Sequence, residues 1–389
     1  MYQILCKDRI SPQGLEELNP AKYTYGEDFP DADGILVHSR PLHDMEFGPN
    51  MKAIIRVGAG FNTIPVDRCS EGGIVVFNTP GGNANAVKEL VIATIILASR
   101  NGLEAIEWTR QLQGKGTEPG KAVEKGKEVF RGPEILGKKL GIIGVGSIGS
   151  RVAKAATALG MHTYGYDPYL TPQTVGELQP HITMVHNPRE LYESCDYISI
   201  HTPLNDETRD YIGREQLALM KRGVYLINFA RGPVINEAAV NEAVRSGHVA
   251  KFVTDFPTDE QLGLDNVIGT PHLGAGTPEA DQNCAYMAVH QMMDYLENGN
   301  ITNAVNLPDV SARRGSGDRV CIIHRNIPAM ISGISNLFSD AAMNIDSLLN
   351  RSRGAMAYTM VDLSGAVSSD QVDALKKIDG VIRVLVYRA

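Results

Sequence analysis

The feature that most constrains the fold of this chain is a glycine-rich turn between a predicted strand and a predicted helix. The apolar run Leu140–Gly144 leads straight into Gly144-Val145-Gly146-Ser147-Ile148-Gly149, and helical patterning follows over Ser150–Leu159. The first glycine permits a tight turn, the second lets a pyrophosphate approach the backbone, and the third lets helix and strand pack closely. Because a helix N-terminus offers free N–H groups and a positive dipole, this arrangement predicts a dinucleotide site.

The next predicted strand, His162–Tyr166, is closed by an acidic residue, Asp167, eighteen positions after Gly149. A carboxylate at this point binds the ribose hydroxyls of the cofactor and repels a 2′-phosphate. The sequence therefore favours NAD over NADP. A structural glycine turn without a cofactor is the alternative, and it leaves the coincidence of strand, glycines, helix and Asp167 unexplained.

Short apolar runs separated by helical patterns lie on both sides of the glycine turn, which is typical of buried parallel strands. They are Tyr2–Cys6, Gly34–Val37, Ala53–Val57 and Ile74–Phe77 in a first series, and Leu140–Gly144, His162–Tyr166, Tyr197–His201, Tyr225–Phe229 and Phe252–Asp255 in a second. Long helices are expected over residues 85–112 and 277–298, and a surface excursion over 113–127. The predicted fold class is therefore α/β, with two doubly wound parallel-sheet domains.

The last seventy residues change character and predict a small, separate domain. Strands are expected at 319–324, 345–351, 356–363 and 381–387, and helices at 329–339 and 369–378. The resulting order βαββαβ is typical of a ferredoxin-like domain. The predicted domains are a first domain of 1–98 and 286–308, a dinucleotide-binding domain of 99–285, a linker of 309–318 and a C-terminal domain of 319–389.

Charge and cysteine content disfavour several classes of function. Lys and Arg number 37 against 45 Asp and Glu, a formal net charge of −8, which disfavours a protein that coats nucleic acid or a membrane surface. The five cysteines are scattered without CxxC spacing, so we expect free thiols, a reducing compartment and no metal site. Lys7, Asp8 and Arg9 stand where a signal peptide would be apolar, so the expected location is the cytoplasm.

Seven segments, in this order, carry a resemblance to a known family. They are 56–60 (Arg-Val-Gly-Ala-Gly), 78–83 (Asn-Thr-Pro-Gly-Gly-Asn), the glycine turn, 201–204 (His-Thr-Pro-Leu), 228–232 (Asn-Phe-Ala-Arg-Gly), Asp255 with Glu260, and 270–274 (Thr-Pro-His-Leu-Gly). With them the chain resembles the D-isomer-specific 2-hydroxyacid dehydrogenases over nearly its whole length. It looks most like the members that use NAD to oxidise 3-phospho-D-glycerate to 3-phosphohydroxypyruvate, the first step of L-serine biosynthesis.

The resemblance implies three catalytic residues, and the chemistry of the reaction agrees with them. Oxidation of an alcohol beside a carboxylate needs a base, which His272 would supply because an imidazole titrates near neutral pH. Glu260 would orient the imidazole and stabilise its protonated form, although Gln261 stands where the family has a proline. Arg231 would bind the substrate's carboxylate and carbonyl oxygen through its planar fork. Taken singly, each of these residues would be read as an ordinary turn or surface residue.

The resemblance also implies contacts with the cofactor. Asp255 would contact the nicotinamide amide. The other residues expected to line the cofactor site are Gly144, Gly146, Ser147, Ile148, Gly149, Asp167, Thr202, Pro203, Ala230 and His272.

A phosphorylated substrate is implied by a second set of residues. Arg56 would bind the phosphate; a structural arginine that caps a strand is the alternative. The backbone N–H groups of Gly58, Ala59 and Gly60 would approach the anionic substrate. Asn83 would lie on the loop that covers the carboxylate. Lys127 would reach the phosphate across a dimer.

The C-terminal domain resembles an ACT domain, a small module that senses amino acids. The resemblance rests on residues 324–328 (His-Arg-Asn-Ile-Pro) and 343–345 (Met-Asn-Ile). It implies that His324, Asn326 and Asn344 bind L-serine between paired ACT domains. Inhibition would follow if serine binds the inactive arrangement more tightly. The expected assembly is a homodimer or homotetramer.

Two other functions stay open at this point. The first is an NAD-dependent dehydrogenase of another D-2-hydroxy acid, such as glycerate, against which Arg56 and the ACT-like domain argue. The second is a regulator that senses NAD without catalysis, which would leave Arg231, Glu260 and His272 without a role.

Overall fold

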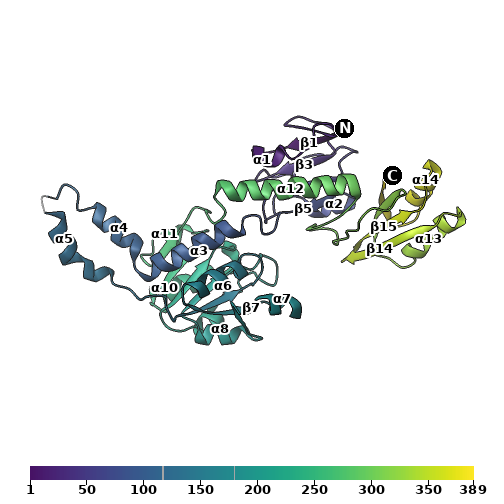
Figure 1. The fold of residues 1–389 in the computed structure, drawn as a ribbon. Coiled ribbons are helices and arrows are strands. Elements are labelled where there is room, and N and C mark those ends of the chain that lie inside the picture. The colour runs from purple at the N-terminus through teal and green to yellow at the C-terminus, as the bar shows by residue number, and fades with distance from the viewer. Residues whose placement is uncertain (116–117, 179) are drawn as a thin grey trace. The chain divides into compact units, whose positions relative to one another are not determined.

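The computed structural model describes residues 1–115, 118–178 and 180–389 and divides into two compact units (Figure 1). One unit comprises Met1–Asn83 and Pro278–Ala389, and the other Ala84–Thr277. The chain thus crosses between units before the helix at residue 84 and before the helix at residue 278. The sequence places these boundaries later, at 98/99 and 285/286, inside or at the end of those helices.

The unit of residues 84–277 is built on a seven-stranded parallel sheet, which confirms the predicted doubly wound class. Its strand order is β12-β11-β10-β9-β6-β7-β8. The order reverses at β6, whose neighbours are β7 on one side and β9 on the other, and such a reversal opens a crevice at the carboxyl ends of the strands. The strands are β6 (Lys139–Ile143), β7 (His162–Tyr166), β8 (Thr183–Met184), β9 (Tyr197–Ile200), β10 (Val224–Asn228), β11 (Val249–Thr254) and β12 (Val267–Gly269).

Helices cover both faces of this sheet because its strands are apolar on both sides. On one face, Val91 and Ile95 of α3 pack with Val152 and Ala156 of α6 in one buried cluster. The opposite face is covered by a second cluster that includes Leu191 and Val240. The helices are α3 (Ala84–Ser99), α4 (Gly102–Arg110), α5 (Pro119–Gly126), α6 (Gly149–Ala158), α7 (Pro172–Leu178), α8 (Pro188–Ser194), α9 (Arg214–Leu219), α10 (Glu237–Arg245) and α11 (Asp259–Leu262).

An arm made of α4 and α5 extends from this unit (Figure 1). The sequence predicts a single helix over 85–112, but Asn101 adopts a left-handed φ of 47° and separates α3 from α4. A helix, α5, also forms where a surface excursion is expected. Trp108 holds the arm together, because its ring lies 5.3 Å from that of Phe130. Residues 116 and 117 of the expected excursion lie outside the described residues.

The other unit begins with a five-stranded parallel sheet in the order β2-β1-β3-β4-β5. The long helix α12 buries Val289 and Met292 in the same cluster as Ile4 and Ile55 of this sheet. The sequence missed β2, a half-buried edge strand. The elements are β1 (Tyr2–Cys6), α1 (Pro12–Leu15), β2 (Tyr23–Gly26), β3 (Gly34–Val37), β4 (Ala53–Arg56), α2 (Val66–Glu71), β5 (Val75–Phe77) and α12 (Pro278–Asn298).

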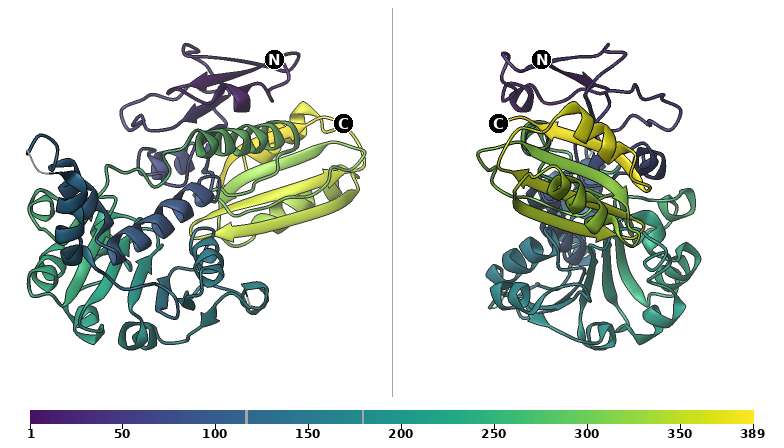
Figure 2. Two further views of the ribbon diagram at one scale, coloured as in Figure 1. Left: turned by 60° about the vertical axis from the view of Figure 1, so that its left-hand side comes forward. Right: turned by 90° about the vertical axis from the view of Figure 1, so that its right-hand side faces the viewer.

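A four-stranded antiparallel sheet ends the chain, as the βαββαβ order predicts (Figure 2). Ile334 and Leu375 of its two helices pack on one face. On the other face, Tyr358 and Cys321 join the cluster that contains Tyr295 of α12. The elements are β13 (Arg319–Arg325), α13 (Met330–Asp340), β14 (Ile345–Arg353), β15 (Met356–Leu363), α14 (Ser369–Lys376) and β16 (Val381–Tyr387).

Candidate active site

The glycine turn has the backbone that a pyrophosphate site needs. Gly144 has a φ of 86°, and a Cβ there would lie 2.9 Å from the carbonyl of His201. A Cβ at Gly149 would press on the Gly144 carbonyl, whereas Gly146 has open space around it. The helix α6 then begins without a side-chain hydrogen bond at its cap. The N–H of Ser150 donates to the Gly146 carbonyl at 3.1 Å, and no side chain competes for the remaining N–H groups at the start of α6, where the helix dipole favours phosphate oxygens.

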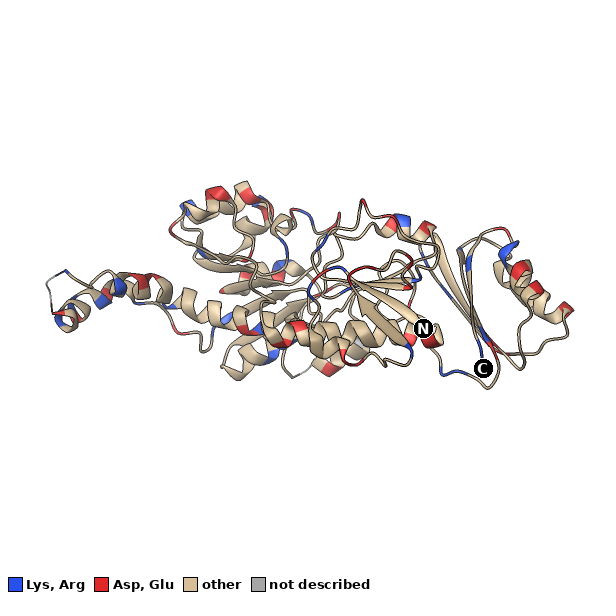
Figure 3. Ribbon diagram, turned by 90° about the horizontal axis from the view of Figure 1, so that it is seen from above, with Lys and Arg blue, Asp and Glu red and all other residues tan. Residues whose placement is uncertain are grey.

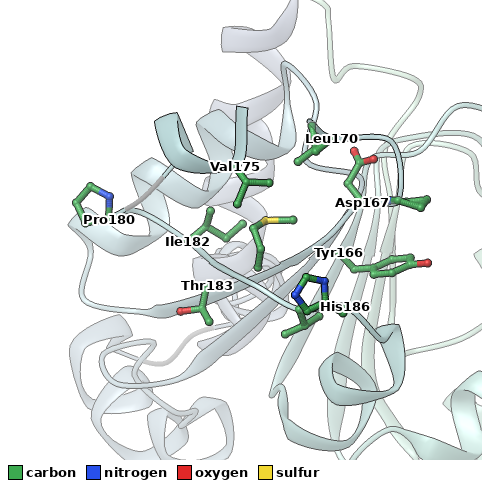
Figure 4. Close-up of a pocket in the computed structure, with 11 residues that line it drawn as sticks. Tyr166, Asp167, Leu170, Val175, Pro180, Ile182, Thr183 and His186 are labelled. Atoms are coloured by element: carbon green, nitrogen blue, oxygen red, sulfur yellow. The ribbon is translucent and has the colours of Figure 1, made fainter. Parts of the chain in front are cut away.

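A cavity of about 760 Å³ lies beside Asp167 at the carboxyl ends of β7 and β8 (Figure 4). The apolar side chains of Leu170, Val175 and Ile182 line it. Oδ2 of Asp167 accepts a hydrogen bond from the Val145 N–H at 2.9 Å, which ties the acid to the glycine turn. A cavity lined by apolar side chains together with the polar Asp167, Thr183 and His186 suits an adenosine, with its ribose hydroxyls on Asp167.

Two buried polar atoms stand beside the glycine turn at the end of β9. Nδ1 of His201 and Oγ1 of Thr202 have no hydrogen-bond partner among the described residues. Nε2 of His201 lies 2.9 Å from Ser199 Oγ, and burial of the ring lowers the pKa of His201 to about 4. The ring is therefore neutral at pH 7. Because buried polar groups are rarely left unpaired, these atoms support a polar ligand at this end of the sheet. The sequence places both residues in one motif, but only Thr202, not His201, was assigned from it to the cofactor site.

The predicted base, His272, stands in a strained turn at the end of β12. Its φ of 55° is left-handed, a conformation that costs an L-residue energy and that recurs at active sites. The buried carboxylate of Asp255 holds this turn. Oδ1 accepts from Thr270 Oγ1 at 2.6 Å and from Leu273 N–H at 2.7 Å, and Oδ2 accepts from Gly274 N–H at 2.7 Å. The contact of Asp255 with the nicotinamide stays a prediction.

Phe256 brings Arg231 and His272 into one neighbourhood. Its ring centroid lies 4.7 Å from that of His272 and 6.0 Å from the guanidinium carbon of Arg231. Burial lowers the pKa of Arg231, which still stays charged. Asn228, fully buried, fixes the turn that carries the arginine: Nδ2 donates to the Arg231 carbonyl at 2.9 Å and Oδ1 accepts from Ala230 N–H at 3.0 Å. The sequence included Asn228 in a motif but did not predict that its side chain fixes the backbone around Arg231.

Glu260 lies on α11 and is directed to α10. Its Oε1 accepts a hydrogen bond from Arg245 at 2.5 Å. Hydrogen bonds from Arg245, first, and from Asn241 lower the pKa of Glu260. The carboxylate is thus ionised and exposed. Its predicted role as the group that orients His272 stays a prediction.

Three of the residues predicted to hold the substrate, Arg56, Gly58 and Asn83, lie at or beyond the carboxyl ends of strands of the five-stranded sheet. Nη1 of Arg56 donates to the Val57 carbonyl at 2.5 Å, and the guanidinium lies directly against Gly58, whose φ is 137°. The N–H of Gly58 donates to Thr79 Oγ1 at 2.6 Å. Oδ1 of Asn83 is buried without a partner among the described residues. A side chain at position 58 would displace Arg56.

Lys127 directly follows α5 of the arm, and its Nζ pairs with Glu124 of that helix at 2.5 Å. Both side chains are exposed, so the pair is weak and the lysine can exchange partners. The predicted contact of Lys127 with the phosphate of a second chain stays a prediction.

One chain does not bring the three predicted serine ligands together. On β15, His324 pairs with Ala357, whereas Ile345, next to Asn344, pairs with Leu363. Six strand positions separate these points, about 20 Å. A shared ligand would therefore need a second copy of the domain. Both ring nitrogens of His324 have partners, the Arg325 carbonyl and Thr359 Oγ1, each at 2.8 Å.

Comparison with known proteins agrees with this geometry. Residues 92–274 match the NAD binding domain of the D-isomer specific 2-hydroxyacid dehydrogenases. The chain is 30% identical to the D-3-phosphoglycerate dehydrogenase of Escherichia coli K12, over 98% of this chain and 96% of that one. This chain belongs to the D-isomer-specific 2-hydroxyacid dehydrogenase family. The residues of the glycine turn, Asp167 and the β9 terminus fit the NAD that this domain binds.

Other members of the 2-hydroxyacid dehydrogenase family show the same relationship. The D-3-phosphoglycerate dehydrogenase of Methanocaldococcus jannaschii is 36% identical to this chain over 80% of this chain's residues. The match covers only 60% of the length of the M. jannaschii protein. The NAD⁺-bound 3-phosphoglycerate dehydrogenase of Entamoeba histolytica has a TM-score of 0.63 at 28% identity, over 78% of this chain and 98% of that one. A glyoxylate reductase from Paecilomyes thermophila, 26% identical over the same shares, scores 0.66. Structural likeness alone therefore does not choose the substrate.

Two properties of the whole dehydrogenase bear on its partners. No helix within 1–115, 118–178 and 180–389 has the length and apolar character to cross a bilayer. Figure 3 shows Lys and Arg interspersed with Asp and Glu along the helices and strands. This distribution agrees with the acidic net charge and disfavours nucleic acid as a partner.

Proposed function

We propose that this dehydrogenase oxidises 3-phospho-D-glycerate to 3-phosphohydroxypyruvate with NAD, the first step of L-serine biosynthesis, in the cytoplasm. The observation that carries the proposal is the match, over almost the entire length of both proteins, to the E. coli D-3-phosphoglycerate dehydrogenase. That match includes the C-terminal sheet, which the dehydrogenase alone does not need. Arg56, placed at the end of β4, supplies a cation for the phosphate.

The roles of the chain's own residues follow from the reaction. NAD, when bound, accepts the hydride from the carbon that bears the hydroxyl. Nε2 or Nδ1 of His272 accepts the hydroxyl proton as the alcohol becomes a carbonyl. Arg231 holds the carboxylate and the developing carbonyl with its fork of N–H donors, and so fixes which face of the carbon is presented.

The mechanism also requires that His272 and Arg231 are held in fixed positions. The Asp255 carboxylate, bound to three groups of the His272 turn, keeps the imidazole in one place. Asn228 does the same for the backbone of Arg231. Glu260 would stabilise the imidazolium once the proton has moved. That role needs a rearrangement of its hydrogen bond with Arg245.

The C-terminal domain is assigned an ACT-type regulatory role, with L-serine as its ligand. His324 and Asn326 of one chain and Asn344 of another would form the site, in agreement with their separation along β15. We assign the arm to the chain–chain contact, because Ile106 and Val129 expose 49% and 77% of their surface there. A homodimer or homotetramer is the assembly that these two contacts support.

A substrate panel tests the proposal. NADH consumption is measured with 3-phosphohydroxypyruvate, hydroxypyruvate and pyruvate, each with and without L-serine. We expect a strong preference for the phosphorylated acid and inhibition by serine. Turnover that ignores the phosphate would leave a general 2-hydroxyacid dehydrogenase. NADH binding without any turnover would favour the non-catalytic regulator instead.

A further inference from the structure

His38 and Arg56 lie at the carboxyl ends of two neighbouring strands of the five-stranded sheet. The strand β3 ends at Val37 and β4 ends at Arg56, and these two residues are partners in the parallel register. His38 is therefore the first residue beyond β3, next to Arg56. Ligands of open α/β sheets bind outside the carboxyl ends of the strands, which is where both side chains begin.

Asp8 holds the backbone of the loop that carries His38. Oδ2 of Asp8 accepts hydrogen bonds from the N–H groups of His38, Ser39 and Arg40 at 2.8, 2.7 and 3.0 Å. Burial alone would raise the pKa of Asp8, but these three donors lower it overall. The shape of the loop thus depends on a carboxylate and on main-chain groups. The imidazole of His38 is not needed for it.

The imidazole of His38 is half-buried and has one ring nitrogen to spare. Nδ1 lies 2.7 Å from Ser39 Oγ, and among the described residues Nε2 has no hydrogen-bond partner. The charged groups that act electrostatically on the ring are Arg56 on β4, Asp281 in the first turn of α12 and Asp8 beyond β1. Burial, first, and Arg56 lower the pKa of His38, while Asp281 and Asp8 raise it, and the net direction is downward. The free imidazole is therefore mostly neutral at pH 7.

We propose that His38 is a second ligand of the substrate phosphate beside Arg56 and that it binds the phosphate as an imidazolium. The inference rests on the proposed function, since it takes the phosphorylated acid as substrate. A phosphate dianion can accept hydrogen bonds from the arginine fork and from the Nε2–H of His38 together. Asp281 repels an anion at this place, and a second positive charge offsets that repulsion.

Proton uptake on binding follows from this assignment. The phosphate favours the charged imidazole, so the pKa of His38 is higher in the complex than in the free protein. The added affinity is complete below the pKa of the free protein and is lost as the pH rises through the pKa of the complex. A phosphorylated ligand therefore takes up a proton that an unphosphorylated one does not.

Calorimetry of the complex with NADH measures this proton. Titration of 3-phospho-D-glycerate into that complex cannot lead to turnover, and buffers of different ionisation enthalpy count the protons taken up. His38→Gln keeps a hydrogen-bonding group without a charge. His43→Gln, at an exposed histidine of the same loop region, is the matched control. D-glycerate is the ligand without phosphate.

We expect wild type and H43Q to take up more protons than H38Q with 3-phospho-D-glycerate at pH 7. At pH 6.5, H38Q should bind that ligand about tenfold more weakly, because it loses a hydrogen bond to a charged group. Its affinity for D-glycerate should be unchanged. His38→Arg should restore tight binding and remove the pH dependence.

Three results would overturn the inference. Proton uptake and affinity equal in wild type and H38Q would show that His38 is not a phosphate ligand, even where the phosphorylated acid is preferred. If H38R binds 3-phospho-D-glycerate no better than H38Q does, a positive charge at position 38 does not contribute to phosphate binding. H38R also serves as the test variant if H38Q fails to bind NADH. Wild type without any preference for the phosphorylated acid would remove the proposed function and this inference with it.

Discussion

At the scale of residues, the candidate active site depends on a buried carboxylate and a left-handed histidine. The sequence predicted the identities of His272 and Arg231 from motifs, because their chemistry requires those residue types. It could not predict that Asp255 bonds to three groups of the His272 turn. Such partners depend on how β11 and β12 lie beside each other, which no local pattern encodes. Asn228 was missed as a supporting residue for the same reason.

Replacement of His272 by asparagine separates catalysis from folding. Asparagine tolerates the left-handed φ of 55° at this position, so the turn should persist. Without a base, kcat should fall by about 10²–10⁴. Steady-state kinetics give kcat, and NADH fluorescence gives the cofactor affinity, which should stay close to wild type. Loss of NADH affinity together with activity would make the histidine structural.

Asp255→Asn should destabilise the protein as well as slow it. An amide can accept hydrogen bonds at only one of the two oxygen positions, and its NH₂ group would face an N–H donor. The expected loss is about 1–3 kcal/mol of unfolding free energy, with a lower kcat. Thermal unfolding measures the first and steady-state kinetics the second. Asp259→Asn, at an exposed carboxylate nearby, is the control. Equal melting temperatures for the two variants would contradict the anchoring role.

At the scale of elements, strands with apolar runs were predicted closely and helix ends less well. Tyr2–Cys6, His162–Tyr166 and Val381–Tyr387 have the predicted bounds, because buried strands carry a strong local signal. The break between α3 and α4 was missed, since the patterning of the helix continues across Asn101. The edge strand β2 was missed because it is only four residues long and contains no Val, Ile or Leu.

An alanine in the left-handed conformation, which suits glycine better, flanks the helix α13 at each end. Ala329 has a φ of 67° and Ala342 a φ of 53°. Glycine at either position relieves the Cβ strain, which exceeds the entropy that glycine adds to the unfolded chain. Ala329→Gly and Ala342→Gly should each raise stability by about 0.5–1 kcal/mol.

Scanning calorimetry of the full chain tests this expectation. Ala374→Gly is the control, because this alanine lies inside α14. This substitution should lower the unfolding free energy by about 1 kcal/mol, opposite to the effect expected for A329G and A342G. If A329G and A342G also lowered the melting temperature, the left-handed strain would be absent.

At the scale of the molecule, the C-terminal domain belongs to the same compact unit as Arg56, and a buried arginine joins it to the preceding segment. Arg319, fully buried, forms two hydrogen bonds with Asp362 at 2.6 and 2.9 Å. The same guanidinium donates to the carbonyls of Asn298, Ala312 and Arg313. The expected linker of 309–318 is thus fixed from both sides. In the sequence, the glycines and arginines of this segment are typical of a flexible linker. The residue that fixes the segment, Arg319, lies just outside it and donates to the carbonyls of Ala312 and Arg313.

Arg319→Met should therefore loosen the whole junction. Removal of one partner leaves the Asp362 charge buried and uncompensated, which costs about 3–5 kcal/mol. Scanning calorimetry should show a lower melting temperature, and limited proteolysis should cut faster within 309–318. Arg325→Met, at an exposed arginine of the same strand, should change neither. Equal proteolysis of the two variants would show that the junction does not depend on Arg319.

In our proposal, this family member acts on a phosphorylated acid and recognises the phosphate through Arg56. The most direct measurement is the ratio of kcat/KM for 3-phosphohydroxypyruvate to that for hydroxypyruvate, in wild type and in Arg56→Gln. We predict a wild-type ratio of at least about a hundredfold, and a variant in which only the phosphorylated acid loses kcat/KM, mainly through KM. A wild-type ratio near one, or an equal loss for both acids in the variant, would contradict it.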